Sequence, residues 1–189
     1  LNASGHSPIF DSSPYILQQS LLFPYNQGAS LINAILLSGQ WQAVSNAYSD
    51  PPISTEQVLH PEKYLEGERP VTVPLPDMPM ALAKEWEVRY DDVMGEFFLK
   101  TYLETRIGTD LASRATAGWG GDRFNLMVSH QGEHALVVLS AWDSERDAKE
   151  FFDAMDSSDS VPDEGFLGLN GDRVLWVMSA SSATTDDIL

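Results

Sequence analysis

The sequence contains no cysteine among its 189 residues. This absence excludes disulfide bonds, thiolate metal sites and cysteine nucleophiles from any function of the chain. It fits any compartment and slightly favours export, where stray thiols are a liability. Histidine is scarce as well, with four residues. No Ser-His-Asp arrangement can be assembled from them, since no nucleophile elbow is present.

Basic residues are also few. Lys and Arg number 11 against 28 Asp and Glu, which gives a net charge of −17 with neutral His. Nucleic acids and anionic lipids select for Lys and Arg, so the sequence predicts that neither is a partner. The hydrophobic fraction of 43% is typical of a folded globule rather than of a disordered acidic tail.

Long hydrophobic runs are missing too. The longest, Ala29–Leu37, is interrupted by Ser30 and Asn33, so no segment of the chain is predicted to span a bilayer. The first residue is Leu1, and no charged stretch followed by an apolar core marks an intact signal peptide. We therefore expect either a processed chain or a piece of a longer one.

The first 66 residues are predicted to be helical. Helices are expected at Tyr15–Leu22, Gln27–Ser38 and Trp41–Tyr48, with the first two separated at Pro24. Ser54 and Gln57 have the spacing of a capping box, which predicts a short helix that ends at His60.

Proline then dominates the next segment. Pro70, Pro74, Pro76 and Pro79 fall within residues 67–81, which predicts an extended connector. Residues 82–189 are predicted to form an α+β domain of antiparallel β-hairpins packed with helices. Its hairpins are expected to turn at Gln131-Gly132 and at Asn170-Gly171, and Ser144 is expected to cap a helix.

One short motif suggests zinc chemistry at first sight. His130 to His134 reads His-Gln-Gly-Glu-His and matches the inverted zincin pattern. That chemistry needs both histidines on one helix face. Gly132 lies inside the motif and strands are expected on both sides, so we predict a solvated turn. The acidic run from Asp156 to Glu164 lacks calcium-loop spacing and is predicted to be a solvated loop.

Two other segments contain candidate site residues. His60 precedes Pro61 and must lie at a corner of the chain, where it could act with Glu56 or Glu62 as a ligand or acid–base group. The alternative, which we favour, is a structural corner histidine bonded to the backbone. Residues 118–123 form a glycine-rich segment with Trp119, Asp122 and Arg123. It lacks a phosphate-loop signature and is predicted to be a tight helix-to-strand turn.

Several blocks resemble a bacterial family of secreted or lipoprotein-like zinc metallopeptidases, of the zincin type. The similarity covers residues 21 to about 152. The blocks that carry it are Leu21–Gly28, Gly39–Val44, Asp50–Tyr64, Ala117–Phe124 and Ala141–Phe151. The block around His60 is the most distinctive part, and the chain corresponds to the C-terminal half of that family.

The resemblance implies a zincin-like parent whose His-Glu-x-x-His helix lies N-terminal to the region seen here. This sequence lacks that helix, so no catalytic residue is carried over and no metal or cofactor is expected in this chain. The candidate residues for a cleft or a partner-facing surface are His60, Glu62, Tyr64, Trp119, Asp122 and Arg123.

We therefore expect a non-catalytic binding or assembly module derived from a zincin-like protein. It would act outside the cytoplasm, in the periplasm or at the cell surface, as a subunit of a larger assembly. Other protein chains are its expected partners, and an assembly peripheral to a membrane is one form of this hypothesis. The alternative is the C-terminal part of an active metallopeptidase whose metal site lies on a segment absent from this chain.

Overall fold

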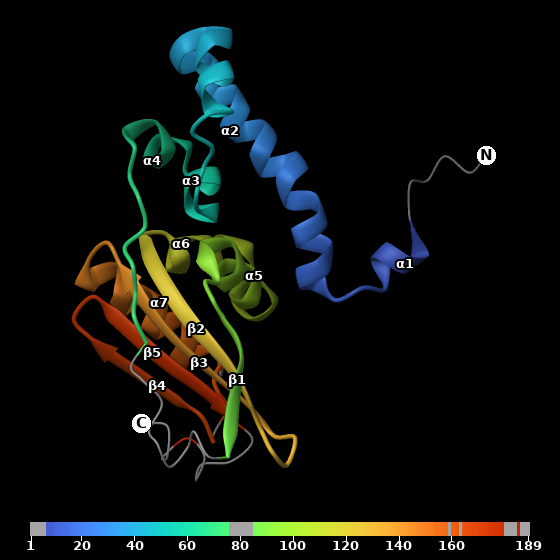
Figure 1. Ribbon diagram of the computed structural model, residues 1–189, viewed down its shortest axis with the longest axis vertical. Coiled ribbons are helices and arrows are strands. Elements are labelled where there is room, and N and C mark those ends of the chain that lie inside the picture. The colour runs from blue at the N-terminus through green and yellow to red at the C-terminus, as the bar shows by residue number, and fades with distance from the viewer. Residues whose placement is uncertain (1–6, 76–84, 159, 163, 180–184, 186–189) are drawn as a thin grey trace. The chain divides into compact units, whose positions relative to one another are not determined.

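The computed structural model describes residues 7–75, 85–158, 160–162, 164–179 and 185. The chain forms two compact units. Unit 1 is Leu1–Arg69 and unit 2 is Pro70–Leu189. Figure 1 shows the helices of unit 1 and the sheet with helices of unit 2.

In the described part of unit 1, all regular secondary structure is helical. Its elements are α1 (Pro8–Asp11), α2 (Tyr15–Ala47), α3 (Thr55–Leu59) and α4 (Pro61–Glu66). A small core forms where Leu31, Ile35 and Val44 of α2 pack with Val58 and Tyr64 of the short helices. The core therefore involves only the second half of α2.

Of the two helix breaks predicted between residues 15 and 48, the break at Pro24 was wrong, and the break between Ser38 and Trp41 is confirmed. Pro24 lies inside α2 and does not end it, because a helical proline removes only its own N–H bond and the flanking turns continue. The confirmed break consists of Gly39 and Gln40, whose backbone angles are not helical. The positive φ, of 57°, belongs to Gln40, whereas a helix of this kind usually ends at a glycine with positive φ, here expected at Gly39.

Unit 2 contains an antiparallel sheet and three helices. Its elements are β1 (Trp86–Asp92), α5 (Gly95–Ile107), α6 (Thr109–Thr116), β2 (Trp119–Ser129), β3 (His134–Trp142), α7 (Glu145–Ser157), β4 (Phe166–Asn170) and β5 (Arg173–Ser179). The five strands are ordered β1-β2-β3-β5-β4, and every neighbouring pair is antiparallel. The predicted α+β class is confirmed.

The main core lies between the sheet and its helices. Side chains alternate across a strand, so Val138 and Trp142 of β3 face the same side as Val174 and Trp176 of β5. These side chains form one buried cluster with residues of the three helices, among them Phe151 of α7. Figure 1 shows these helices on one side of the sheet.

The predicted hairpins are present. β2 and β3 meet at a turn that contains Gly132, and β4 and β5 meet at Gly171-Asp172, one residue later than expected. Ser144 caps α7 as predicted, because its hydroxyl accepts the Asp147 N–H at 3.3 Å. The tight turn expected at residues 118–123 was wrong, since β2 already begins at Trp119.

The start of the proline-rich segment lies against the sheet of unit 2. The Val71 N–H donates to the Gly120 carbonyl at 2.7 Å, and the Val73 side chain is buried. Residues 76–81 of the predicted connector are outside the described residues. Within the described part of the chain, no helix is both long and apolar enough to cross a membrane.

Candidate functional site

The candidate residues fall into two groups, one in each unit. His60, Glu62 and Tyr64 lie where α3 meets α4 in unit 1. The first half of strand β2 in unit 2 contains Trp119, Asp122 and Arg123. Each group is a local arrangement within its own unit.

His60 occupies the corner between α3 and α4, as its position before Pro61 predicted. Its φ of −122° and ψ of 80° are not helical, so one helix ends there and the next begins. Its backbone N–H donates to the Glu56 carbonyl at 2.7 Å. Its Nδ1 lies 3.7 Å from a carboxylate oxygen of Glu62, which is too long for a hydrogen bond. This histidine therefore serves the geometry of the corner.

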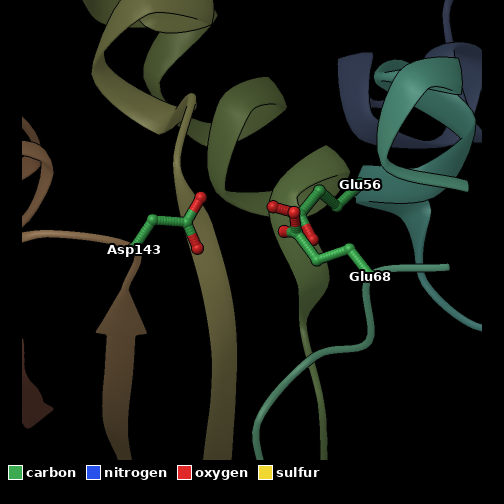
Figure 2. A group of neighbouring side chains, drawn as sticks. All are labelled: Glu56, Glu68 and Asp143. Carbon is green, nitrogen blue, oxygen red and sulfur yellow. The ribbon is translucent and has the colours of Figure 1, made fainter. Parts of the chain in front are cut away.

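A buried ion pair stabilises the same corner, and it was not predicted from the sequence. Glu56 is 1% exposed, and its carboxylate lies 2.5 Å from Nζ of Lys63. Lys63 also reaches Glu68 at 2.7 Å. Carboxylate oxygens of Glu56 and Glu68 lie within 4.8 Å of one another, and Figure 2 shows both side chains. Because Lys63 bridges these two carboxylates, the pair already has a cation from the chain itself.

The capping box at the start of α3 is confirmed with one change. Ser54 Oγ accepts the Gln57 N–H at 3.1 Å, as expected for an N-cap. The Gln57 side chain reaches the N–H of Ile53, at 2.7 Å, rather than that of Ser54. Its amide also donates to the Glu68 carbonyl at 2.5 Å, which ties the end of α4 back to the start of α3.

Tyr64 connects α4 to the end of α2. Its hydroxyl donates to the Asp50 carbonyl at 2.8 Å. Desolvation, together with the Asp50 charge, raises the pKa of Tyr64 above its usual value. The phenol therefore stays protonated at neutral pH and acts as a hydrogen-bond donor.

Asp122 is the central residue of the group in unit 2. The side chain is 3% exposed, yet its carboxylate accepts three N–H groups. One oxygen accepts from Gly95 at 2.8 Å and from the Trp119 indole at 2.9 Å, and the other accepts from Met94 at 2.7 Å. Two of these donors belong to the start of α5, so the carboxylate caps that helix from a neighbouring strand.

Burial has the largest effect on the pKa of Asp122. Desolvation raises its pKa above the ordinary value, although the bonds from Met94, Gly95 and Trp119 each act in the opposite direction. A buried carboxyl with a raised pKa in a cleft would suggest acid–base catalysis. Here the carboxylate oxygens already accept three donors of the fold, which favours a structural role.

Arg123 points to the other face of β2, because neighbouring strand residues alternate in direction. Its Nε donates to Asp91 of β1 at 2.6 Å. This bond lowers the pKa of the Asp91 carboxyl below its ordinary value. Both side chains are exposed, so the pair contributes little to stability.

The zincin-like motif at residues 130–134 lies in the turn between β2 and β3. His134 begins β3 opposite Val128, and the His130 N–H donates to the Glu85 carbonyl at 2.9 Å. Without a helix, the two rings are not one turn apart on a common face. The prediction of a turn is confirmed. In the acidic run, Asp159 and Asp163 lie outside the described residues.

The most prominent exposed feature was not found by the sequence reasoning. Eight large apolar side chains of α2 are exposed, and four of them share one side of the helix: Leu17 at 53%, Leu21 at 62%, Tyr25 at 78% and Ile32 at 43%. We call these four residues the α2 stripe. Their spacings of four and seven residues place them on one side of the helix. No charged residue occurs between Asp11 and Asp50, which was the available sequence signal.

A groove between α6 and α7 was also missed. It encloses about 410 Å³ and lies wholly within unit 2. Its lining residues are Ile107, Leu111, Arg114, Ala115, Glu150, Asp153, Ala154 and Ser157. The lining combines apolar side chains with one cation, Arg114, and two carboxylates, Glu150 and Asp153.

Comparison with known proteins identifies a family for unit 2. Residues 86–189 match the family described as "Domain of unknown function (DUF8575)", and this match covers more than half of the chain. The match begins at the first residue of β1 and includes all five strands. The chain belongs to this family. No curated protein and no solved structure gives a match.

Proposed function

We propose that this member of the DUF8575 family is a non-catalytic binding and assembly module, acting as a subunit of a larger protein complex. The observation that carries the proposal is the α2 stripe. Four large apolar side chains are exposed on one side of a helix without any charge, in a chain whose net charge is −17. Surfaces of this kind mark sites of contact with other proteins more often than isolated apolar residues do.

The energetics of the stripe support contact with a partner. Full burial of a side chain such as Leu contributes about 1.5–3 kcal/mol. Leu17, Leu21, Tyr25 and Ile32 are between 43% and 78% exposed, so most of that free energy is still available for association. The side of the helix away from the stripe carries uncharged polar residues, among them Gln19, Asn26 and Ser30.

The candidate residues of unit 2 fit the same proposal. Asp122 is committed to α5, and Arg123 to Asp91. In unit 1, Tyr64 and Lys63 are committed to neighbouring elements. These side chains support rigid scaffolds on which an interaction surface can be presented.

Descent from a zincin-like parent and action outside the cytoplasm remain parts of the proposal. They are supported by the sequence blocks that resemble that family, above all the block around His60. The DUF8575 match runs from residue 86 onward and includes the blocks Ala117–Phe124 and Ala141–Phe151, and its description names no function. The two similarities therefore share residues 86 to about 152, whereas the block around His60 lies outside the DUF8575 match.

The test is the state of the protein in its native source. Size-exclusion chromatography with native mass spectrometry is expected to find the chain in a complex heavier than 20.9 kDa. A free monomer would contradict the assembly role. Metal analysis of the same material separates the alternative, because stoichiometric, tightly held zinc would instead favour the metallopeptidase function.

A further inference from the structure

We infer that the partner of the α2 stripe is a second copy of this chain, and that two α2 helices pair along Leu21, Tyr25, Gly28 and Ile32. This inference rests on the proposed assembly function and names its partner. It concerns the exposed side of α2 as far as Ile32, whereas Leu31 and Ile35 belong to the small core formed with α3 and α4.

The distribution of charge along the chain favours a second copy as the partner. The 38 residues from Ser12 to Ser49 contain no Asp, Glu, Lys, Arg or His, while the chain as a whole carries −17. Two copies that meet through most other surfaces bring acidic groups together, and this repulsion opposes association. Two copies that meet along α2 avoid it. A strongly basic partner or an anionic lipid would find no charge on α2 to recognise.

The spacing of the seam fits a paired helix. Leu21, Tyr25, Gly28 and Ile32 follow each other at intervals of four, three and four residues, which is the heptad pattern of two packed helices. Leu17 lies one turn before Leu21 on the same side and extends the apolar surface. The opposite side of the helix carries Ser30, which is exposed.

Gly28 gives the second, independent observation. It lies inside α2 with no atom of a neighbouring element within 4 Å of where a Cβ would stand. Its φ is not in the left-handed region, so the backbone conformation does not require glycine. Glycine disfavours a helix, and no packing contact among the described residues requires it at this position. A glycine in the seam permits the backbone of a second helix to approach closely.

The first half of α2 also needs a partner to be stable as a helix. It contains Pro24 and Gly28, the two residue types least favourable in a helix interior, and it has no charged pairs at i and i+4. Most of its stability must therefore come from packing. A second α2 supplies an apolar, uncharged surface of matching length.

The experiment measures the mass of the full chain by sedimentation equilibrium in about 1 M salt, where charges more than roughly 3 Å apart are screened. The wild type is expected at twice 20.9 kDa. Leu21→Asp is expected to weaken association at least about tenfold, because it places a charge in the seam. Ser30→Asp is the matched control, since it places the same charge on the opposite side and should leave association unchanged.

Gly28→Ala is the deciding second variant. In a lone helix it should raise helix content, whereas in a paired helix it should also weaken association because the added methyl group meets the partner. It replaces Leu21→Asp as the test if circular dichroism shows that the aspartate variant loses helix. The inference is overturned if the wild type is a monomer at every concentration, or if Leu21→Asp and Ser30→Asp associate equally. It is also overturned if Gly28→Ala associates more tightly.

These outcomes separate the inference from the function on which it rests. A wild-type chain that is monomeric when pure, but occurs in a complex with a different protein in its native source, overturns the second copy as partner. The assembly function would stand in that case. A monomer in both preparations overturns both.

Discussion

The Asp122 carboxylate accepts the Gly95 backbone N–H at 2.8 Å, and this bond joins the middle of the sheet to the first turn of α5. The two residues are 27 positions apart in the sequence. The same carboxylate accepts the Trp119 indole N–H, so one buried side chain orients a helix and a large core aromatic ring.

Replacing Asp122 by Ala is expected to destabilise the protein by about 3 kcal/mol, because three donors lose their charged acceptor. Urea denaturation followed by circular dichroism measures the change. Arg123→Ala is the neighbouring control and should have little effect, since its pair with Asp91 is exposed. Equal effects of the two substitutions would contradict the role of Asp122.

The raised pKa of Asp122 predicts a pH dependence. Its pKa in the folded protein lies above the ordinary value of 3.8, so between these two values the native state holds a proton that the unfolded state has released. The stabilising contribution of Asp122 is therefore complete below about 3.8 and falls as the pH rises through the folded pKa. The free energy of unfolding of the wild type minus that of Asp122→Asn should decrease over this window. A difference that grows with pH would show that the pKa is lowered instead.

Lys63→Met tests the ion pair in unit 1. The substitution removes the cation that lies 2.5 Å from the buried Glu56 carboxylate, and about 2–4 kcal/mol of stability should be lost. The double variant Glu56→Gln with Lys63→Met should recover a large part of that loss, because the buried charge is gone. Thermal unfolding of the two variants and the wild type provides the comparison. A double variant no more stable than Lys63→Met would rule out this explanation.

Gly121→Val tests the contact between the proline-rich segment and the sheet. A Cβ at Gly121 would fall on the carbonyl oxygen of Val71, which is backbone and cannot turn away. The segment at Val71 should be displaced, and the Val71 amide, now bonded to Gly120, should exchange with deuterium much faster. Gly120→Ala is a milder control, since its nearest neighbour is the Asp143 side-chain oxygen at 3.1 Å. Unchanged exchange at Val71 in the Gly121 variant would contradict this assignment.

Local signals in the sequence predicted much of the fold. Ser144 capped α7, and the Gly-containing turns formed hairpins, because each depends on a few adjacent residues. Pro24 was misjudged because a proline inside a long apolar helix costs one hydrogen bond, and the flanking turns can carry the helix past it.

The candidate site was less accessible to prediction. Asp122 was named as a candidate, but its role as the cap of α5 depends on a contact between β2 and a helix 27 residues earlier. The pair of Glu56 with Lys63 also depends on how α3 folds against α4. The α2 stripe could have been found, since the absence of charge from Ser12 to Ser49 is visible in the sequence. Only the structure showed that these apolar residues remain exposed.

The most direct test of the account is hydrogen–deuterium exchange of the α2 amides from residue 15 to residue 30, measured over a range of protein concentrations. If α2 pairs with a second copy, these amides should be protected at high concentration, and dilution should remove that protection. Leu21→Asp should exchange rapidly at all concentrations. Protection in the wild type that does not change with concentration, or rapid exchange even in concentrated solution, would contradict assembly through α2.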